Sequence, residues 1–178
     1  HGGILAMYAD GFQDTNGKGN GGQLAGWCMA QGEEHGYHFG GDVYQRIELS
    51  ENGLDCRIVP ASDPVGEGTY NAAEFTPALI KDGEKIEDSF WTGEQPRACF
   101  GTGDQGVYML IIEGRYPDEG IRGTSVNTCS DILLAYGCRN ALNMDGGSSA
   151  ILWYDGEYVT QSSSSFLRYT GGRPLPNA

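Results

Sequence analysis

Glycine is the residue that most restricts how this chain can fold. It occupies 29 of the 178 positions, about twice its usual share of roughly 7%. The glycines do not recur at every third position, which excludes a collagen-like helix. Glycines scattered through a globular composition are typical of short strands joined by tight turns. We therefore predict an α+β fold, a twisted mixed β-sheet core with few helices, as one domain over residues 1–178 that is part of a longer protein.

Short apolar runs bounded by turn residues predict most of the secondary structure. The run 107–112 is apolar on both faces, so we expect this strand in the centre of a sheet. Asn52-Gly53 and Asp155-Gly156 are typical hairpin turns. The other predicted strands are residues 4–9, 24–30, 43–49, 77–80, 98–101, 140–144, 151–154 and 157–160.

One segment has the spacing of an amphipathic helix. Thr124 or Ser125 can cap its start, and Gly137 can take the left-handed conformation after its end. The predicted apolar face consists of Val126, Cys129, Leu133 and Tyr136.

Charge and cysteine spacing narrow the range of partners. The 11 basic and 24 acidic residues give a net charge of −13, so we expect no nucleic-acid partner and no attraction to an anionic membrane. No apolar run reaches the roughly 18 residues of a spanning helix, so we expect no membrane insertion. The five cysteines contain no CxxC pair, which speaks against zinc and leaves disulfide pairing open.

The stretch 139–149, RNALNMDGGSS, holds the first candidate site. An apolar strand ends here in Asp145, followed by two glycines and two hydroxyl side chains. Gly146 and Gly147 allow the backbone to approach a ligand and to turn N–H groups towards an anion. The alternative is an ordinary strand–turn–strand, because Asp and Gly are the commonest turn residues.

Arginines beside glycine or proline hold the second candidate feature. They occur in Gln95-Pro96-Arg97, Glu113-Gly114-Arg115 and Gly171-Gly172-Arg173-Pro174. A guanidinium matches the oxygens of a phosphate, so these arginines can form an anion pocket within an acidic protein. Surface ion pairs are the alternative.

Histidines and serines support other chemistries less well. His35 and His38 could contribute to a metal site with Glu33 or Glu34, although exposed loop histidines explain them better. A serine hydrolase is disfavoured, because the G-x-S-x-G motif is absent from the chain.

Several motifs in the same order resemble the phosphodiester glycosidase family. The most specific is Ala141 to Ser149 (ALNMDGGSS), which resembles the family's ALNLDGGGSS signature. The supporting segments are FTPALIKDG at 75–83, PRA at 96–98 with FG at 100–101, IIEGR at 111–115, RP at 173–174 and NA at 177–178. The chain departs from the family pattern where Ala9 replaces an Asn, Thr128 replaces a Glu and Glu113 replaces an Asp.

The resemblance implies hydrolysis at the anomeric carbon of a sugar-1-phosphodiester, such as an N-acetylglucosamine-1-phosphodiester, in envelope or polysaccharide metabolism. It implies Asp145 as the first catalytic carboxylate and Glu113 as the second. The predicted substrate-binding residues are Asp10, Arg97, Arg115, Asn143, Gly146, Gly147, Ser148, Ser149 and Arg173.

The resemblance also bears on cofactors, location and rival functions. We expect no resident cofactor and no metal site, although Asp10, Asp14 and Asp145 could offer oxygen ligands to a divalent cation. The expected partner is a sugar phosphate or a polysaccharide, and the expected location is outside the cell or at its surface. Two alternatives remain: a non-catalytic relative that binds glycans or cell-wall polymer, suggested by Ala9 and Thr128, and a purely structural module of a surface protein.

Overall fold

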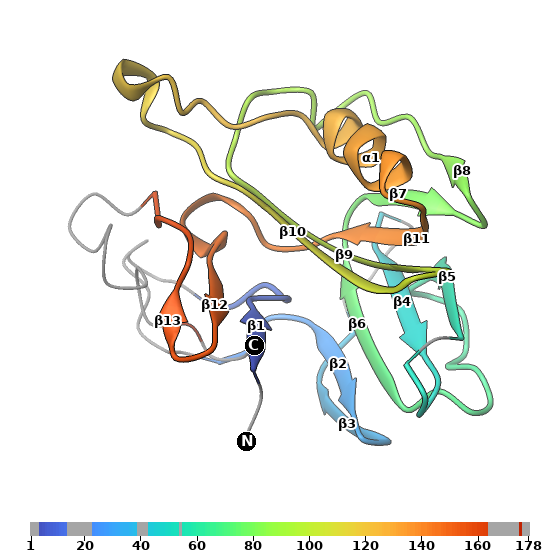
Figure 1. Cartoon of the computed structure of the whole chain (residues 1–178). Coiled ribbons are helices and arrows are strands. Elements are labelled where there is room, and N and C mark those ends of the chain that lie inside the picture. The colour runs from blue at the N-terminus through green and yellow to red at the C-terminus, as the bar shows by residue number, and fades with distance from the viewer. Residues whose placement is uncertain (1–3, 14–22, 39–42, 54, 164–174, 176–178) are drawn as a thin grey trace.

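The computed structural model describes residues 4–13, 23–38, 43–53, 55–163 and 175, and builds them into three sheets and one α-helix (Figure 1). The central sheet has the order β10 (Gly106–Ile112), β9 (Arg97–Gly103), β11 (Cys138–Asn143), β7 (Ala78–Lys81) and β8 (Glu84–Lys85). The second sheet has the order β3 (Glu33–Gly36), β2 (Trp27–Ala30), β6 (Asn71–Phe75), β4 (Gln45–Leu49) and β5 (Cys56–Pro60). The small sheet joins β1 (Leu5–Met7), β12 (Leu152–Tyr154) and β13 (Glu157–Tyr158). The helix is α1 (Val126–Ala135), and two short 3₁₀ turns are η1 (Pro117–Glu119) and η2 (Gly147–Ser149).

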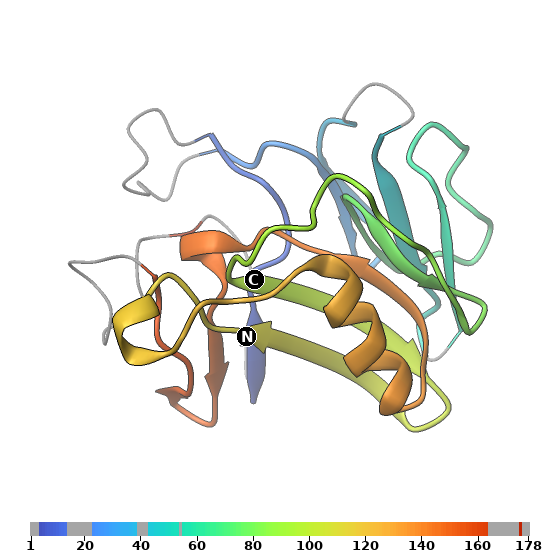
Figure 2. The ribbon, with the colours of Figure 1, turned by 90° about the horizontal axis from the view of Figure 1, so that it is seen from above.

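The central sheet lies between two layers. Helix α1 covers one face, and the second sheet packs against the other (Figure 2). Successive residues of β9 therefore enter different cores: Ala98 faces the second sheet, and Cys99 faces the helix. Leu142 and Ala141 divide in the same way. This explains why these strands are apolar at consecutive positions, since both faces of the sheet are covered.

The predicted fold class is confirmed, with strands far outnumbering helices in the described residues. Every strand pair in that part of the chain is antiparallel, so the sheets differ from the predicted mixed sheet in this respect. The hairpin turn at Asp155-Gly156 is confirmed, with φ of +45° and +95° at its two residues. All five cysteines are free thiols.

Strand β10 corrects one prediction. The run 107–112 was expected in the centre of a sheet, but β10 lies at the edge and pairs only with β9 among the described strands. Its apolar character has another cause: Leu110 packs in the core under α1, and Met109 packs in the core between the sheets. A run of apolar residues reports that both faces are covered, and it does not report how many neighbours the strand has.

Helix α1 begins and ends as its sequence predicts. The Ser125 side chain accepts a hydrogen bond from the backbone N–H of Thr128 at 3.2 Å, and Gly137 has a φ of +87°. Tyr136 is the exception on the predicted apolar face, because its side chain is 71% exposed. Its contribution is instead a backbone carbonyl that accepts the Tyr108 hydroxyl at 2.9 Å.

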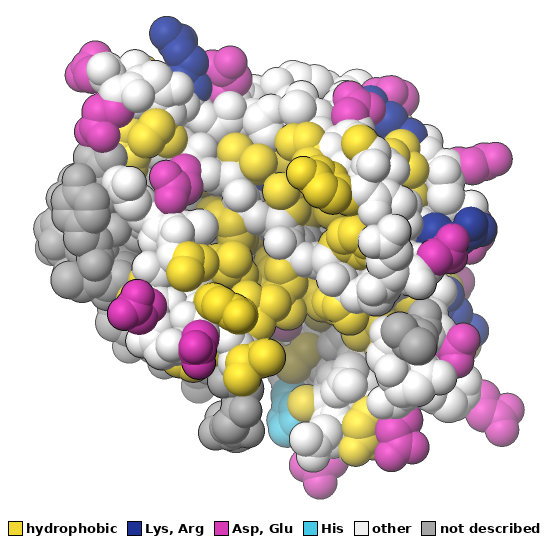
Figure 3. Space-filling view, viewed as in Figure 1, with side chains coloured by type: hydrophobic (Ala, Val, Ile, Leu, Met, Phe, Trp, Pro, Cys, Tyr) yellow, Lys and Arg dark blue, Asp and Glu magenta, His cyan; other side chains and the backbone are white. Residues whose placement is uncertain are grey.

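An apolar hollow remains where the sheets meet. Figure 3 shows hydrophobic side chains gathered there, and a cavity of about 180 Å³ lies between β1, β2, β6 and β10. All four methionines of the chain line it: Met7, Met29, Met109 and Met144. Flexible thioether side chains suit an irregular gap between packed sheets.

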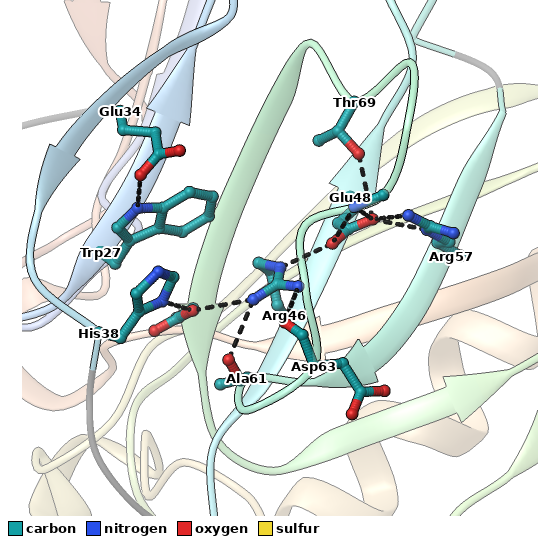
Figure 4. Close-up of polar contacts among 11 residues, drawn as sticks. Trp27, Glu34, His38, Arg46, Glu48, Arg57, Ala61, Asp63 and Thr69 are labelled. Atoms are coloured by element: carbon teal, nitrogen blue, oxygen red, sulfur yellow. Dashed lines mark hydrogen bonds and ion pairs between the residues drawn. The ribbon is translucent and has the colours of Figure 1, made fainter.

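The outer face of the second sheet carries a buried charged cluster that we did not predict (Figure 4). Arg46 is fully buried; its Nε donates to Glu48 Oε1 at 2.7 Å, and its Nη1 donates to Glu74 Oε1 at 3.3 Å. His38 lies 2.6 Å from the same Glu74 oxygen and stacks on Trp27. The residues between these charges, such as Ile47, point into the core, so the alternation along β4 is polar outward and apolar inward.

Candidate active site

A cleft of about 410 Å³ opens where β11 ends. Two backbone hydrogen bonds position the loop that follows the strand: the Met144 N–H donates to the Ala98 carbonyl at 2.8 Å, and the Asp145 N–H donates to the Ala9 carbonyl at 3.0 Å. The cleft brings together seven residues predicted from sequence. They are Arg97, Arg115, Asn143, Asp145, Gly146, Gly147 and Ser148.

The two glycines are required because neighbouring groups approach them closely. A Cβ on Gly146 would lie 2.6 Å from the Pro96 carbonyl oxygen. A Cβ on Gly147 would lie 3.2 Å from Nη2 of Arg115, and Gly147 also has a φ of +56°. The Gly147 N–H donates to the Pro96 carbonyl at 3.0 Å. The glycine pair therefore joins the loop to the residues that precede β9.

Arg115 presents its guanidinium directly over Gly147. Its Nε donates to Gln95 Oε1 at 3.0 Å, while Nη1 and Nη2 donate to none of the described residues. Its side chain is exposed and its backbone has a φ of +68°. The two terminal nitrogens form the part of the guanidinium fork that can take an oxyanion in the cleft.

The protein itself occupies most of the Arg97 guanidinium, which we predicted to bind phosphate. It is 5% exposed, and its Nε and Nη2 donate to three backbone carbonyls, of Thr124 at 3.0 Å, Trp91 at 3.3 Å and Gly93 at 2.9 Å. Burial lowers the pKa of Arg97 from its ordinary value. This side chain thus holds the segment 91–95 and the start of α1 in place, and among the described contacts only Nη1 remains for a ligand.

Asn143 offers a hydrogen-bond acceptor at the cleft. Its Nδ2 donates to the Thr76 carbonyl at 2.7 Å, and its Oδ1 is buried with no partner among the described residues. The residue is only 4% exposed and lines the cleft. A buried acceptor without a partner is unfavourable by about 1–3 kcal/mol, so a ligand hydroxyl or amide N–H would relieve that cost.

Comparison of the chain with known proteins gives its family. The family model for phosphodiester glycosidases matches residues 2–178. The chain belongs to this family. No curated protein sequence matches it.

Solved structures support the same fold. The zebrafish N-acetylglucosamine-1-phosphodiester alpha-N-acetylglucosaminidase catalytic domain, auto-inhibited by its pro-peptide, is similar with a TM-score of 0.66 and 17% identity. The match covers 98% of this chain and 60% of the zebrafish chain. A hypothetical protein from Synechocystis matches with a TM-score of 0.54 and 16% identity, over 89% of this chain and 49% of that one. At such identities the likeness establishes the fold.

Four of the site residues predicted for this member of the phosphodiester glycosidase family do not line the cleft. Asp10, Glu113 and Ser149 lie elsewhere, and Arg173 lies outside the described residues. Ser149 is fully buried and does not line the cleft. Asp10 is buried beside Cys28, where burial and then the neighbouring Asp10 raise the pKa of the Cys28 thiol to about 11. Arg173, like the possible cation ligand Asp14, lies outside the described residues.

The predicted second carboxylate, Glu113, does not line the cleft. Its Oε1 accepts the Gln161 N–H at 2.7 Å, so it anchors the segment after β13. In a regular strand, residues 113 and 115 would point to the same side. The positive φ of Arg115 turns the backbone there, and the two side chains bind different partners.

The family positions at which this chain departs are also placed. Ala9 contributes its carbonyl to the Asp145 N–H and its methyl group to the apolar hollow. Thr128 is exposed in the first turn of α1 and lies outside the cleft lining. Sequence reasoning missed Trp91, which lines the cleft and belongs to none of the motifs. Phe75 and Gln95 also line it; both lie in motifs that were identified, but neither was predicted as a site residue.

A metal centre finds no support in the described residues. No group of three or more His, Cys, Asp or Glu side chains there could hold an ion. His38 belongs to the buried charged cluster, and His35 is exposed on β3. Within the same residues, no helix is long and apolar enough to cross a membrane.

Proposed function

We propose that this phosphodiester glycosidase relative hydrolyses a sugar-1-phosphodiester, with an N-acetylglucosamine-1-phosphodiester as the model substrate. The observation that carries the proposal is the composition of the cleft. A carboxylate from Asp145, the terminal nitrogens of Arg115 and the unsatisfied oxygen of Asn143 line one space. The carboxylate can activate water at an anomeric carbon, and the guanidinium can bind a phosphate. The amide oxygen can accept a hydrogen bond from a hydroxyl or N–H of the sugar.

Arg115 supports the phosphate-binding part of this role. A departing phosphate is already a good leaving group, so it needs charge neutralisation more than protonation. The guanidinium supplies that charge, and loss of such a contact typically slows a reaction by about 10²–10³-fold. Arg97 contributes mainly by holding the cleft wall, because three carbonyls occupy its other nitrogens.

Asp145 supports the chemical step. It is the single carboxylate among the described residues that line the cleft. It can activate a water molecule, or it can attack the anomeric carbon and be displaced by water afterwards. Because the leaving phosphate requires no general acid, one carboxylate is sufficient for direct attack by water, with Asp145 taking the water proton. The double displacement needs a second base for the water that hydrolyses the glycosyl ester, so the single carboxylate of the cleft favours direct attack.

Asn143 supports recognition of the sugar. Its Oδ1 accepts a hydrogen bond, so it favours a sugar that offers a hydroxyl or acetamido N–H at that point. An enzyme for envelope or polysaccharide sugar phosphates would act outside the cell or at its surface, and we extend the proposal to that location. Detection of the protein in the surface or medium fraction, with its absence from the cytosol, tests the extension.

Sugar release from the methyl diester of N-acetylglucosamine-1-phosphate tests the activity. We expect Asp145→Asn to lower kcat by about 10²–10⁴-fold, as removal of an acid–base group does. Asp155→Asn is the matched control: it removes the same charge at a hairpin turn outside the cleft, where Asn also tolerates a positive φ. Full activity of Asp145→Asn would refute the assignment.

A non-catalytic glycan-binding role is the second candidate. It is favoured by Ala9 and Thr128 at positions where the family pattern has Asn and Glu, and by the turning away of Glu113. Saturable binding of the diester by the folded protein, with no sugar released over days, would support this role in place of hydrolysis.

A further inference from the structure

An apolar groove of about 720 Å³ runs beside the cleft. It lies between the segment that follows β8 and the β4–β5 edge of the second sheet, with β7 at its base. Its walls include Val43, Ile58, Pro60, Ile86, Phe90 and Trp91. The volume falls within the range of small-molecule sites, which are mostly apolar with a few polar groups.

The groove and the cleft adjoin each other. Trp91 lines both of them. The neighbouring residues Phe75 and Thr76 divide in the same way: Phe75 lines the cleft, and Thr76 lines the groove. A molecule bound with its phosphate at Arg115 can therefore extend past Trp91 into the groove.

The aromatic wall of the groove is held in place although it faces solvent. Phe90 is 89% exposed and Trp91 is 46% exposed. Oδ1 of Asp88 accepts both of their backbone N–H groups, at 2.9 Å and 2.5 Å. Asn127 on α1 fixes Asp88 in turn, donating to its carbonyl at 2.8 Å and accepting its N–H at 2.9 Å. An exposed aromatic pair on an ordered segment is a surface prepared for an apolar ligand.

The polarity changes sharply from one space to the other. The cleft offers a guanidinium, a carboxylate and an amide, whereas the groove walls are mostly hydrocarbon. We propose that the substrate is a sugar-1-phosphodiester of an aliphatic alcohol, whose alkyl chain lies along the groove from Trp91 to Phe90. This inference rests on the proposed function, and it adds the class of the alcohol.

The test compares three diesters of N-acetylglucosamine-1-phosphate, carrying methanol, octanol or glucose, with octyl ester kept below its micelle concentration. A fully buried methylene raises affinity by up to about fourfold, so a partly open groove should favour octyl over methyl by roughly tenfold or more in kcat/KM. The glucose ester should show no such gain. Titration calorimetry with the same esters measures the preference in binding alone.

Phe90→Ser provides the decisive variant, because its exposed side chain contributes little to the folded core. It should leave methyl-ester turnover unchanged and reduce the octyl advantage to less than about threefold. Tyr136→Ser is the matched control, an exposed aromatic outside the groove, and should keep the full advantage.

The remaining outcomes would each overturn either the aliphatic alcohol or the hydrolysis. Equal kcat/KM for methyl and octyl esters, a preference for the glucose ester, or an octyl advantage that survives Phe90→Ser would overturn the aliphatic alcohol while the enzyme activity stands. A dimer that dissociates on Phe90→Ser would assign the groove to a second copy of the chain and overturn it as well. No sugar released from any ester would overturn the hydrolysis, and the binding ratio of octyl to methyl ester would still decide the groove.

Discussion

At the scale of single residues, Gly147 and Arg115 constrain each other. Both have positive φ angles, +56° and +68°, and the guanidinium of one lies over the α-carbon of the other. Left-handed backbone is unfavourable by roughly 1–2 kcal/mol for a residue with a side chain, so the site stores strain at Arg115. What this conformation achieves is the separation of Arg115 from Glu113, two residues that a straight strand would place together.

Gly147→Ala should impair activity more than stability. The new Cβ must displace Nη2 of Arg115, 3.2 Å away, in addition to the backbone cost of about 1–2 kcal/mol. We expect sugar release to fall at least tenfold. Gly53→Ala is the matched control, with a φ of +71° and no atom within 4 Å of its Cβ; it should lose similar stability in urea and keep its activity. Equal activities of the two variants would contradict the argument.

At the scale of elements, β4 carries the charged cluster on its outward face. Glu48 receives hydrogen bonds from the buried Arg46 and from the half-exposed Arg57. Burial raises the pKa of Glu48, but the hydrogen bonds from these arginines outweigh it, and the net pKa is lowered. The same strand therefore contributes apolar side chains to the core and a neutralised set of charges to its outer surface.

Removal of Arg46 should be far more destabilising than removal of Arg57. Arg46→Met leaves Glu48 and Glu74 buried without their shared cation, which typically costs about 3–5 kcal/mol. Arg57→Met removes a cation whose side chain is 51% exposed, and the expected cost is below about 1 kcal/mol. Urea unfolding of the two variants measures the difference, and comparable midpoints would show that the cluster contributes little.

Acid should weaken this cluster. Because the folded pKa of Glu48 lies below its unfolded value of about 4.3, its stabilisation is present above that pH and is lost as the pH falls through the folded pKa. Unfolding free energies measured at descending pH should decline in this window. The decline should be shallower in Glu48→Gln, and an unchanged slope would exclude Glu48 as a contributor.

At the scale of the whole molecule, the central sheet belongs to both cores. Leu142 faces the second sheet and its neighbour Ala141 faces α1, and both are fully buried. The cleft lies at the end of the same strand, so the geometry of the site depends on both layers. We expect the described layers to unfold in one cooperative transition rather than layer by layer.

Leu142→Ala should cost about 2–5 kcal/mol, because it leaves a cavity between the sheets. Far-UV circular dichroism and tryptophan fluorescence should report the same shifted midpoint in urea. Two separate transitions would show instead that the second sheet is an independent unit. Leu5→Ala, at a side chain 40% exposed, is the control and should shift the midpoint much less.

The amino-acid sequence by itself determined the features that depend on a few neighbouring residues. The cap at Ser125, the turn at Asp155-Gly156 and the Asp-Gly-Gly loop after an apolar strand are such features, since their causes lie within one turn or one strand end. Family motifs located most of the cleft in the same way.

Only the tertiary structure decided which of these residues meet. The edge position of β10, the carbonyls that occupy Arg97, the turning away of Glu113 and the burial of Arg46 all depend on strand register and layer packing between distant segments, and no local pattern encodes those contacts.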